Sequence, residues 1–418
     1  MKTITRHISN IIEKRIKNRN IISVIGARQT GKTTLCRDIL PENLGLDYRY
    51  FLFDDPDERN RFKHNGIKIL ENTDADIIIL DEVQKIPEIF EYIKYVSDTE
   101  DKKKIYLLTG SSQLLLLKNI RESLAGRISI FPLFPFSLFE LSENDKPILS
   151  NLMKERDINN INDRFYGYSS EKIRRLINIS ELLRKFGGFP PVWKIKNTDE
   201  KMAWLKDYKK TYLEKDLTDI GGFSDIDSFA SVHKMLSTRN SQLLILSNIA
   251  KDVGLSVNTV KKYLNILKLT FQCFALEPFS ENIKKRMVKS PKIYFTDIGI
   301  LKAVLGEEAV SSGTLYESHV FSELLKWKEN SEEEYELFFY RTSAGMEIDF
   351  LIKKGDFILP IEVKTTMNPN KSDARNIYRF MKEHAPKNTE FGLIIYPGKN
   401  IVEIKKNIYA IPDWFIFS

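Results

Sequence analysis

The sequence predicts an α/β protein in which a parallel sheet carries helices on its faces. Two observations in the first third of the chain lead to this prediction. Five short runs of β-forming residues alternate with helical stretches, the order that joins parallel strands through crossover helices. A glycine-rich loop also follows the first run directly. The five runs are Ile21 to Ile25, Tyr48 to Phe53, Ile77 to Leu80, Ile105 to Thr109 and Ile128 to Phe131.

The composition fits two or three globular domains and excludes several classes of protein. The chain has 418 residues, of which 42% are hydrophobic and 29% charged. Its apolar runs fall short of the ~18 residues that a membrane-spanning helix needs, so we expect no membrane partner. The first twenty residues lack the apolar stretch of a secretory signal, which predicts a cytoplasmic protein. Two distant cysteines, Cys36 and Cys273, cannot supply a disulfide framework or a four-ligand zinc site.

The glycine-rich loop has the pattern of a loop that binds nucleotide phosphates. It comprises Gly26, Ala27, Arg28, Gln29, Thr30, Gly31, Lys32 and Thr33, and Thr34 follows it. Loop N–H groups and the positive end of the next helix surround the β-phosphate in such a loop. Lys32 reaches the β- and γ-phosphates, and the hydroxyl of Thr33 ligates Mg²⁺. The sequence therefore predicts a P-loop that binds ATP with Mg²⁺.

Two acids at the end of the third strand predict that the nucleotide is hydrolysed. Asp81 and Glu82 follow the apolar run from Ile77 to Leu80, at the sheet edge where ligands of open α/β folds bind. We expect Asp81 to hold Mg²⁺ through water and Glu82 to align the attacking water and accept its proton. The alternative, that both acids cap the following helix, leaves the nearby P-loop unexplained.

Two further residues are candidates for contact with the γ-phosphate. Ser111 follows the fourth strand and is the expected sensor of that phosphate. Arg127 precedes the fifth strand and is a candidate arginine finger, which would act on the nucleotide of a neighbouring subunit in a homo-oligomer. A surface ion pair is the alternative role for Arg127.

Several short motifs give the chain a resemblance to a known family, the prokaryotic AAA+ ATPases with a C-terminal domain of unknown function, DUF4143. The motifs lie at Asp54–Pro56, Leu80–Gln84, Thr109–Ser112, Leu124–Arg127, Gly187–Pro190, Ser290–Gly299 and Arg341–Lys364. The resemblance implies a P-loop NTPase core of the AAA+ (ASCE) type with a helical lid, then a winged helix and a PD-(D/E)XK nuclease-like α/β domain.

The organisation of the chain agrees with that order. We expect an ATPase core at 1–141, a helical subdomain at 142–230, a winged helix at 231–290 and the nuclease-like domain at 291–418, with the DUF4143 region at about 205–370. Within the helical subdomain, the stretch 142–163 indicates a connection or an irregular excursion, while 171–185 and 200–217 have helical periodicity.

A basic window coincides with a helix-turn-helix pattern. Residues 231–290 hold ten Lys and Arg against three Asp and Glu, a net charge of +7 that equals the charge of the whole chain. Ser247 and Ser256 are candidate N-caps on either side of a turn at Gly254. The charge suits the phosphates of double-stranded DNA, although a solvated surface has the same composition.

The second helix of this pattern carries the candidate DNA-binding residues, which are Asn258, Thr259, Lys261, Lys262 and Asn265. Amides, hydroxyls and lysines suit the base edges and phosphates of a major groove. Lys284, Lys285 and Arg286 are candidates for a wing that touches phosphates. The alternative is that the module packs against protein.

Three carboxylates and a lysine in the C-terminal part resemble a nuclease site. Glu362 and Lys364 lie two apart on one strand, and therefore on one face. Asp349 lies on the preceding strand, across a hairpin at Gly355, and Glu317 on an upstream helix. In PD-(D/E)XK nucleases such residues hold Mg²⁺ and activate water. Ile348 stands where these nucleases usually have proline, and the fold also recurs as a binding module without activity.

The sequence thus favours an ATP-hydrolysing AAA+ protein whose nucleotide state controls a DNA-engaging, nuclease-like C-terminal half. The alternative is an ATP-gated switch or scaffold that contacts protein partners and cleaves no DNA. His233 and His319 have no companion at metal-ligand spacing, so we expect core or surface positions for both.

Overall fold

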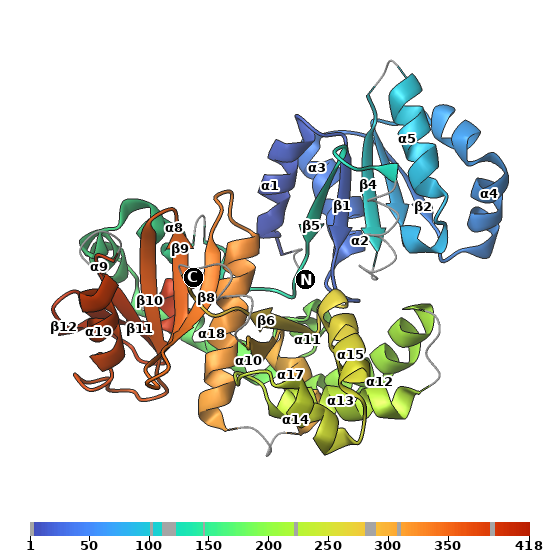
Figure 1. The fold of residues 1–418 in the computed structure, drawn as a ribbon. Helices are drawn as coiled ribbons and strands as arrows, with labels where there is room; N and C mark the ends of the chain where they lie inside the picture. Colours follow the sequence, from blue (N-terminus) through green and yellow to red (C-terminus); the bar gives the residue numbers. More distant parts are fainter. Residues whose placement is uncertain are drawn as a thin grey trace.

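The structure, a computed structural model of the chain, describes residues 4–100, 103–110, 123–144, 147–220, 225–280, 290–306, 311–384 and 389–418, with the backbone alone for 212–220. Figure 1 shows three parts: an N-terminal sheet with its helices at the upper right, a helical unit below it, and a C-terminal sheet at the left.

The N-terminal sheet confirms the α/β class and all five predicted strands to within one residue. Its strands are parallel and lie in the order β2-β3-β4-β1-β5. They are β1 (Ile21–Ile25), β2 (Tyr48–Leu52), β3 (Ile77–Asp81), β4 (Ile105–Gly110) and β5 (Ile128–Pro132).

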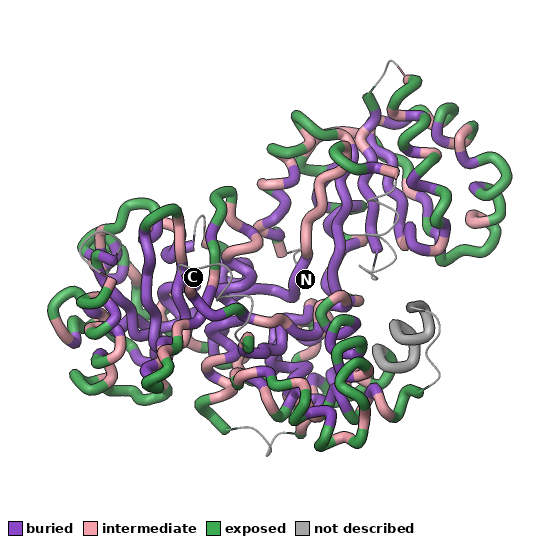
Figure 2. The backbone as a smooth tube through the Cα atoms, in the orientation of Figure 1, coloured by how far each residue is buried: buried purple, intermediate pink, exposed green. Residues whose placement is uncertain are grey.

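Helices cover both faces of this sheet, which explains why its central strands are continuous apolar runs. On one face, Ile22 and Val24 of β1 pack with Ile8. On the other face, Ile21 and Ile25 pack with residues of α4 and α5. The helical elements are α1 (His7–Ile16), α2 (Lys32–Thr34), η1 (Leu35–Ile39), α3 (Leu40–Leu44), α4 (Pro56–Glu71), η2 (Val83–Lys85) and α5 (Ile89–Thr99). Figure 2 shows the central strands buried along their length.

The helical unit packs around one apolar cluster. Its elements are α11 (Pro190–Lys194), α12 (Thr198–Ile220), α13 (Ile226–Thr238), α14 (Leu246–Val253), α15 (Val257–Leu269), α17 (Ile298–Leu305) and an antiparallel pair of strands, β6 (Cys273–Leu276) and β7 (Lys292–Phe295). A long helix, α10 (Ser170–Phe186), leads into the unit. The helical periodicity predicted for 171–185 and 200–217 is confirmed by α10 and α12.

The helix-turn-helix pattern is largely as predicted. Gly254 ends α14 with φ +69°, and the side chain of Ser256 caps α15 by accepting a hydrogen bond from the N–H of Thr259 at 3.1 Å. The prediction that Ser247 caps the first helix is wrong, because α14 begins one residue earlier, after Ile245.

The C-terminal sheet is mixed and has the order β12-β13-β11-β10-β9-β8. Strands β8, β9 and β10 form antiparallel pairs, and β11 joins β10 in parallel. The predicted hairpin at Gly355 joins β9 to β10, with φ +57° at the glycine. The strands are β8 (Glu336–Arg341), β9 (Glu347–Lys354), β10 (Phe357–Val363), β11 (Gly392–Tyr396), β12 (Val402–Lys405) and β13 (Ile408–Pro412); the helices are α18 (Ser312–Glu329), α19 (Arg375–His384) and α20 (Asp413–Ile416).

The region 142–230 does not form the single helical subdomain that we expected. Where the pattern predicts a connection, the structure has α8 (Ile148–Glu155) and α9 (Ile158–Tyr166), preceded by α7 (Leu138–Ser142). Leu152 and Phe165 of α8 and α9 pack with Phe350 and Trp414 in the core of the C-terminal part. Helical periodicity reveals an apolar face but not the core that covers it, so this assignment required the tertiary structure.

The expected boundary at 291 also shifts. Strand β7 pairs with β6, and α17 packs among the helices of the helical unit, so both belong with that unit. The C-terminal part therefore begins with α18, although α8 and α9 join it from earlier in the chain. Among the helices in the described ranges, none combines the length and the apolarity needed to cross a membrane.

His233 lies in the core, one of the two positions expected of it, and its burial there makes stability depend on pH. Burial beside Phe295, reinforced by the charge of Lys209, lowers the pKa of His233 to about 3. An unfolded histidine titrates near pH 6.5, so unfolding takes up a proton below that pH, and stability falls as the pH drops from about 6.5 toward 3. We expect this residue alone to cost about 2 kcal/mol at pH 5 relative to neutral pH.

Urea unfolding of the wild type and of His233→Gln between pH 7.5 and 5 measures this effect. The variant should lose stability less steeply with acid than the wild type. Equal slopes would show that His233 does not contribute.

Candidate nucleotide site and C-terminal carboxylate cluster

The P-loop is held in a tight conformation between β1 and α2. A Cβ at Gly26 would overlap the carbonyl oxygen of Leu133, so this position requires glycine. Gly31 has φ +97°, a left-handed conformation that also favours glycine. The ammonium of Lys32 donates hydrogen bonds to the carbonyls of Gly26 and Ala27 at 3.0 and 2.9 Å. Lys32 thus already lies over the loop where phosphates would bind.

Asp81 is the centre of a set of oxygen ligands beside the P-loop. The hydroxyl of Thr33 donates to Oδ2 of Asp81 at 2.8 Å, and the hydroxyl of Tyr50 donates to the same oxygen at 2.7 Å. The hydroxyl of Thr109 donates to Oδ1. Burial and the carboxylate of Asp81 raise the pKa of Tyr50, so it remains a donor at neutral pH. A hydroxyl and a carboxylate in contact are the ligand types that Mg²⁺ takes, so the expected metal fits these residues.

Glu82 adopts a conformation that is unusual for its residue type. Its φ is +59°, in the left-handed region, immediately after β3. Its N–H donates to the hydroxyl of Thr109 at 3.4 Å, and the side-chain amide of Gln84 donates to its carboxylate. Strained conformations of this kind, which cost of order 1–3 kcal/mol, concentrate at functional sites. The structure thus places Glu82 beside Asp81, at the carboxyl edge of the sheet.

The other predicted loop residues surround the same site. Thr30 is buried and its hydroxyl donates to the carbonyl of Ala27 at 2.9 Å. Gln29 is exposed with φ +62°, Arg28 is half-buried and Thr34 is exposed. The expected sensor, Ser111, lies outside the described residues, as do Lys284, Lys285 and Arg286.

Arg127 is not near its own P-loop. Arg127 precedes β5, level with the start of β1, whereas the P-loop follows the end of β1. The start of β1 and the first residue of the P-loop are five residues apart, or about 16 Å along the strand. Its guanidinium forms an exposed ion pair with Asp98. The structure thus favours the surface ion pair, and an action on a neighbouring subunit stays a prediction.

The sequence did not predict three residues that contact the nucleotide site, which are Tyr50, Thr109 and Arg6. Tyr50 and Thr109 lie on the strands that flank β3, and their value depends on strand order, which a pattern of parallel strands leaves open. Thr109 belongs to the motif Thr109–Ser112, so its position two residues before Ser111 was the available signal. Arg6 precedes α1 and had no local signal, because its partners lie 24 to 134 residues away.

Arg6 connects the P-loop to the segment 133–140, which follows β5 and leads into α7. Its guanidinium donates to the carbonyl of Thr30 at 2.7 Å and to the carboxylate of Glu140 at 2.9 Å. Both side chains are almost fully buried. Burial raises the pKa of Glu140, but Arg6 and two backbone N–H groups outweigh this, and the net shift is downward. The pair is therefore charged, and it fixes the segment 133–140 to the P-loop.

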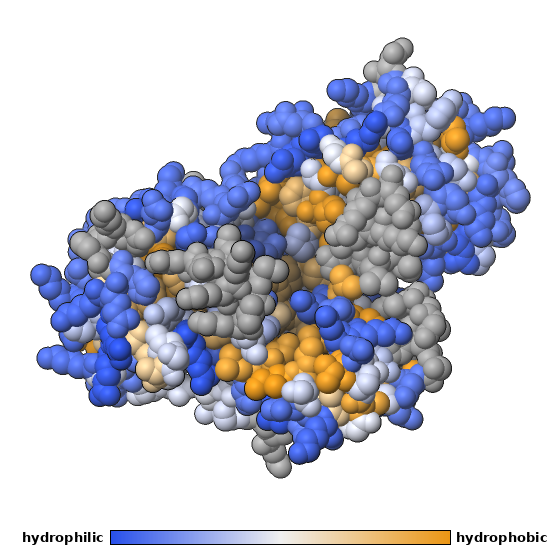
Figure 3. Space-filling model, viewed as in Figure 1, coloured by the Kyte–Doolittle hydropathy of each residue, from blue (hydrophilic) through white to orange (hydrophobic). Residues whose placement is uncertain are grey.

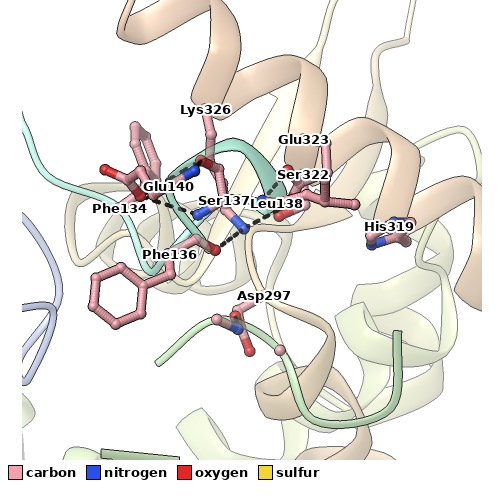
Figure 4. Close-up of polar contacts among 12 residues, drawn as sticks. Phe134, Phe136, Ser137, Leu138, Glu140, Asp297, His319, Ser322, Glu323 and Lys326 are labelled. Carbon is pink, nitrogen blue, oxygen red and sulfur yellow. Dashed lines mark hydrogen bonds and ion pairs between the residues drawn. The ribbon is translucent and has the colours of Figure 1, made fainter. Parts of the chain in front are cut away.

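The same segment is held from the other side by α18 (Figure 4). The ammonium of Lys326 donates to the carbonyl of Phe136 at 3.0 Å, and the N–H of Leu138 donates to the carboxylate of Glu323 at 2.7 Å. The N–H of Phe136 also donates to the carbonyl of Gly188 in the helical unit at 2.7 Å. All three parts of the molecule therefore meet at the segment 133–140.

The predicted DNA-binding residues share one surface of α15. Asn258, Lys261, Lys262 and Asn265 are exposed. Thr259 is half-buried, and its hydroxyl is bonded to that of Ser256 at 2.8 Å. Below the N-terminal sheet, Figure 3 shows hydrophilic residues beside apolar ones on the helical unit.

The C-terminal carboxylates gather as the sequence predicts. Glu317 comes from α18, Asp349 from β9 and Glu362 from β10, while Lys364 follows β10 and its ammonium lies 2.8 Å from Glu362. Burial, then the negative charge of Asp349, raises the pKa of Glu317 and of Glu362 to about 7. The charge of Asp349 contributes to both shifts, so Asp349 lies near both glutamates.

A divalent metal does not fit this carboxylate cluster. Within the part of the chain that the structure describes, no three Asp, Glu, His or Cys side chains are arranged to hold a metal ion. Asp349 accepts the N–H of Val363 at 2.8 Å, and Glu362 faces Lys364 and Asn376. One oxygen of Asp349 and both oxygens of Glu362 are thus already occupied by donors from the chain itself.

Solved structures with some similarity include a RuvB mutant of Thermotoga maritima and a Bacteroides Pif1 bound to ssDNA. The RuvB mutant is 15% identical, covers 64% of this chain and 86% of its own, and has a TM-score of 0.29. Pif1 is 17% identical, covers 42% and 49%, and has a TM-score of 0.22. Similarity at this level supports no conclusion about fold or function.

Relatives that match most of the chain include uncharacterized proteins from two bacteria and an archaeon. One from Mycobacterium tuberculosis is 25% identical over 94% of this chain and 80% of its own length. One from Methanocaldococcus jannaschii is 26% identical over 82% and 75%, and one from Haemophilus influenzae is 22% identical over 86% of each. The similarity thus spans the parts of the molecule rather than one of them.

Three family models match consecutive stretches of the chain. Residues 18–142 match an AAA domain, 169–311 match a domain of unknown function (DUF8612), and 312–415 match another (DUF4143). The DUF4143 match begins at α18, later than the range 205–370 that the resemblance implied, because the helical unit matches a model of its own. These matches confirm the predicted combination of an AAA domain with a C-terminal DUF4143 domain.

Proposed function

We propose that this protein hydrolyses ATP at the P-loop and that its nucleotide state controls the C-terminal half. The contact between Thr33 and Asp81, with Glu82 beside it, carries the first part of this proposal. A loop that only held a nucleotide would need no acid positioned to activate water.

Each side chain has a separate task in this proposal. Lys32 exchanges its carbonyl partners for phosphate oxygens, which are better partners for an ammonium. Thr33 and Asp81 would hold Mg²⁺, which supplies neutralisation of the phosphate charge when it is bound. Glu82 aligns water and accepts its proton, and Gln84 fixes the orientation of its carboxylate.

The segment 133–140 supports control of the C-terminal half. Arg6 bonds to the P-loop carbonyl of Thr30, and the segment that Arg6 also holds is bonded to Glu323 and Lys326 of α18. Ala27 of the P-loop packs in the apolar cluster of the helical unit. A change in loop conformation on binding phosphate is therefore expected to reach both other parts.

DNA is the partner that the exposed surface of α15 favours. The surface combines two lysines with two amides, and its helix follows a turn of helix-turn-helix type. Three helices and the antiparallel pair β6–β7 are the elements of a winged helix, which supports that assignment. Metal-dependent cleavage is not part of the proposal, since the carboxylate cluster does not fit a metal.

Steady-state hydrolysis of Mg²⁺-ATP with and without duplex DNA tests the whole proposal. Lys32→Ala should abolish turnover, because the loop loses the cation that binds the β- and γ-phosphates. Lys94→Ala, which removes an exposed lysine of α5, is the matched control and should behave as the wild type. Turnover that survives Lys32→Ala would place hydrolysis elsewhere, and turnover indifferent to DNA would favour a protein partner.

The salt dependence of DNA binding tests the role of α15. If Lys261 and Lys262 contact phosphates, replacing both by alanine should reduce the slope of log K against log salt by about 2. The same double change at Lys63 and Lys68, exposed on α4, is the control. An unchanged slope in the α15 variant would place the DNA on another surface.

A further inference from the structure

A buried lysine lies among the C-terminal carboxylates. Lys292 begins β7 in the helical unit, and its side chain is 4% exposed. Its ammonium lies 2.6 Å from Oε1 of Glu347 and 3.3 Å from Oε1 of Glu317. Tyr294, two residues along the same strand, donates its hydroxyl to that oxygen of Glu317 at 2.5 Å. One face of β7 is thus directed at the carboxylates.

The ammonium of Lys292 is charged in this setting. Burial lowers its pKa, but Glu317, Asp349 and Glu347 outweigh burial, and the net shift is upward. A buried cation is tolerated only where anions surround it, and buried anions need a cation for the same reason. Lys292 and the cluster therefore depend on each other.

A cavity borders one side of the ion pair between Lys292 and Glu347. A cavity of about 370 Å³ lies between the helical unit and the C-terminal sheet, and Lys292 and Glu347 line it together with Arg239 and Arg341. A hydrated ion could enter this space. Glu317 and Glu347 are instead paired with a positive charge that the chain itself supplies, and Arg341 adds a second one 3.4 Å from Glu347.

We propose that Lys292 is the resident cation of the C-terminal carboxylate cluster and takes the role that a divalent metal has in the nuclease-like fold. The ammonium holds Glu317 of α18 and Glu347 of β9 together. It also ties the helical unit to the C-terminal sheet, because it comes from β7. The wild-type protein accordingly binds no divalent ion at this cluster.

Binding of Mn²⁺ to the nucleotide-free protein tests this proposal. The measurement uses the full chain with Lys32→Ala, so that the P-loop contributes no nucleotide-dependent site and the result is independent of the ATPase. With Lys292 present, we expect no saturable Mn²⁺ binding at millimolar concentration that Asp349→Asn removes, because any Mn²⁺ held by Thr33 and Asp81 does not depend on Asp349. Lys292→Met, which keeps the length of the side chain and removes its charge, should gain one bound Mn²⁺ per chain. Adding Asp349→Asn should abolish that gain.

Two results would overturn the proposal. The first is that the protein with Lys292 intact binds one Mn²⁺ and that Asp349→Asn abolishes this binding. This result can be obtained without any variant at position 292. The second is a folded Lys292→Met protein that binds no Mn²⁺. If Lys292→Met does not fold, Lys292→Gln replaces it, and circular dichroism establishes folding before each titration.

Discussion

Replacing Glu82 with glutamine is expected to lower kcat for ATP hydrolysis by about 10²- to 10⁴-fold, the usual contribution of a general base. Glutamine has nearly the same shape and can still accept a hydrogen bond from Gln84, but it takes no proton from water. The affinity for ATP should change little, because Lys32 and the loop N–H groups bind the phosphates. A coupled ATPase assay and a titration with a fluorescent ATP analogue separate the two effects.

Glu88→Gln provides the matched control. Glu88 is an exposed carboxylate six residues further along, just before α5, and the same substitution there should leave kcat unchanged. Wild-type turnover in Glu82→Gln would remove the residue from the proposed role. Loss of ATP affinity in that variant would indicate that the left-handed conformation at position 82, rather than its proton chemistry, is what the site requires.

Replacing Arg6 with alanine is expected to destabilise the protein by about 3–5 kcal/mol, the cost of leaving a buried carboxylate without its partner. Glu140 keeps the N–H groups of His7 and Ser137 but loses its guanidinium partner. The P-loop also loses the donor that holds the carbonyl of Thr30. Urea unfolding measures the stability, and the KM for ATP should rise as the loop becomes less ordered.

Lys14→Ala separates this effect from the general loss of a basic residue near the N-terminus. Lys14 on α1 also pairs with a distant acid, Glu332, but both side chains are largely exposed, and such pairs contribute only about 0–1 kcal/mol. A double variant, Arg6→Met with Glu140→Gln, should recover part of the lost stability, since neither group remains as an unpaired charge. Equal effects of Arg6→Ala and Lys14→Ala would contradict the role of the buried pair.

The N-terminal sheet could be predicted because each of its strands is recognised from its own residues. Strands buried on both faces must be apolar at successive positions, so a run such as Ile77 to Leu80 indicates a strand by itself. The P-loop is equally local, since its spacing of glycines and Lys32 is dictated by a single phosphate-binding turn. The carboxylate cluster was predictable for a related reason: the helix and the two strands that each bring one acid to it lie close together in the chain.

The contacts between parts of the molecule could not be predicted in the same way. Arg6 pairs with Glu140, which lies 134 residues further along the chain, and the sequence around Arg6 gives no sign of this contact. Lys292 belongs to a motif that carried the family resemblance, yet its role follows only from the position of β7 beside α18. The helices α8 and α9 likewise have amphipathic faces whose partner is decided by the tertiary fold.

The segment 133–140 has a consequence for any ligand of the C-terminal half. A coupling free energy between two binding sites is reciprocal: if ATP changes the affinity for a ligand by some factor, the ligand changes the affinity for ATP by the same factor. Because Lys326 and Arg6 both donate hydrogen bonds to this short stretch of backbone, a ligand that binds against α18 is expected to change how tightly the P-loop holds its nucleotide. A partner would then act as a nucleotide-exchange or nucleotide-retention factor without touching the nucleotide.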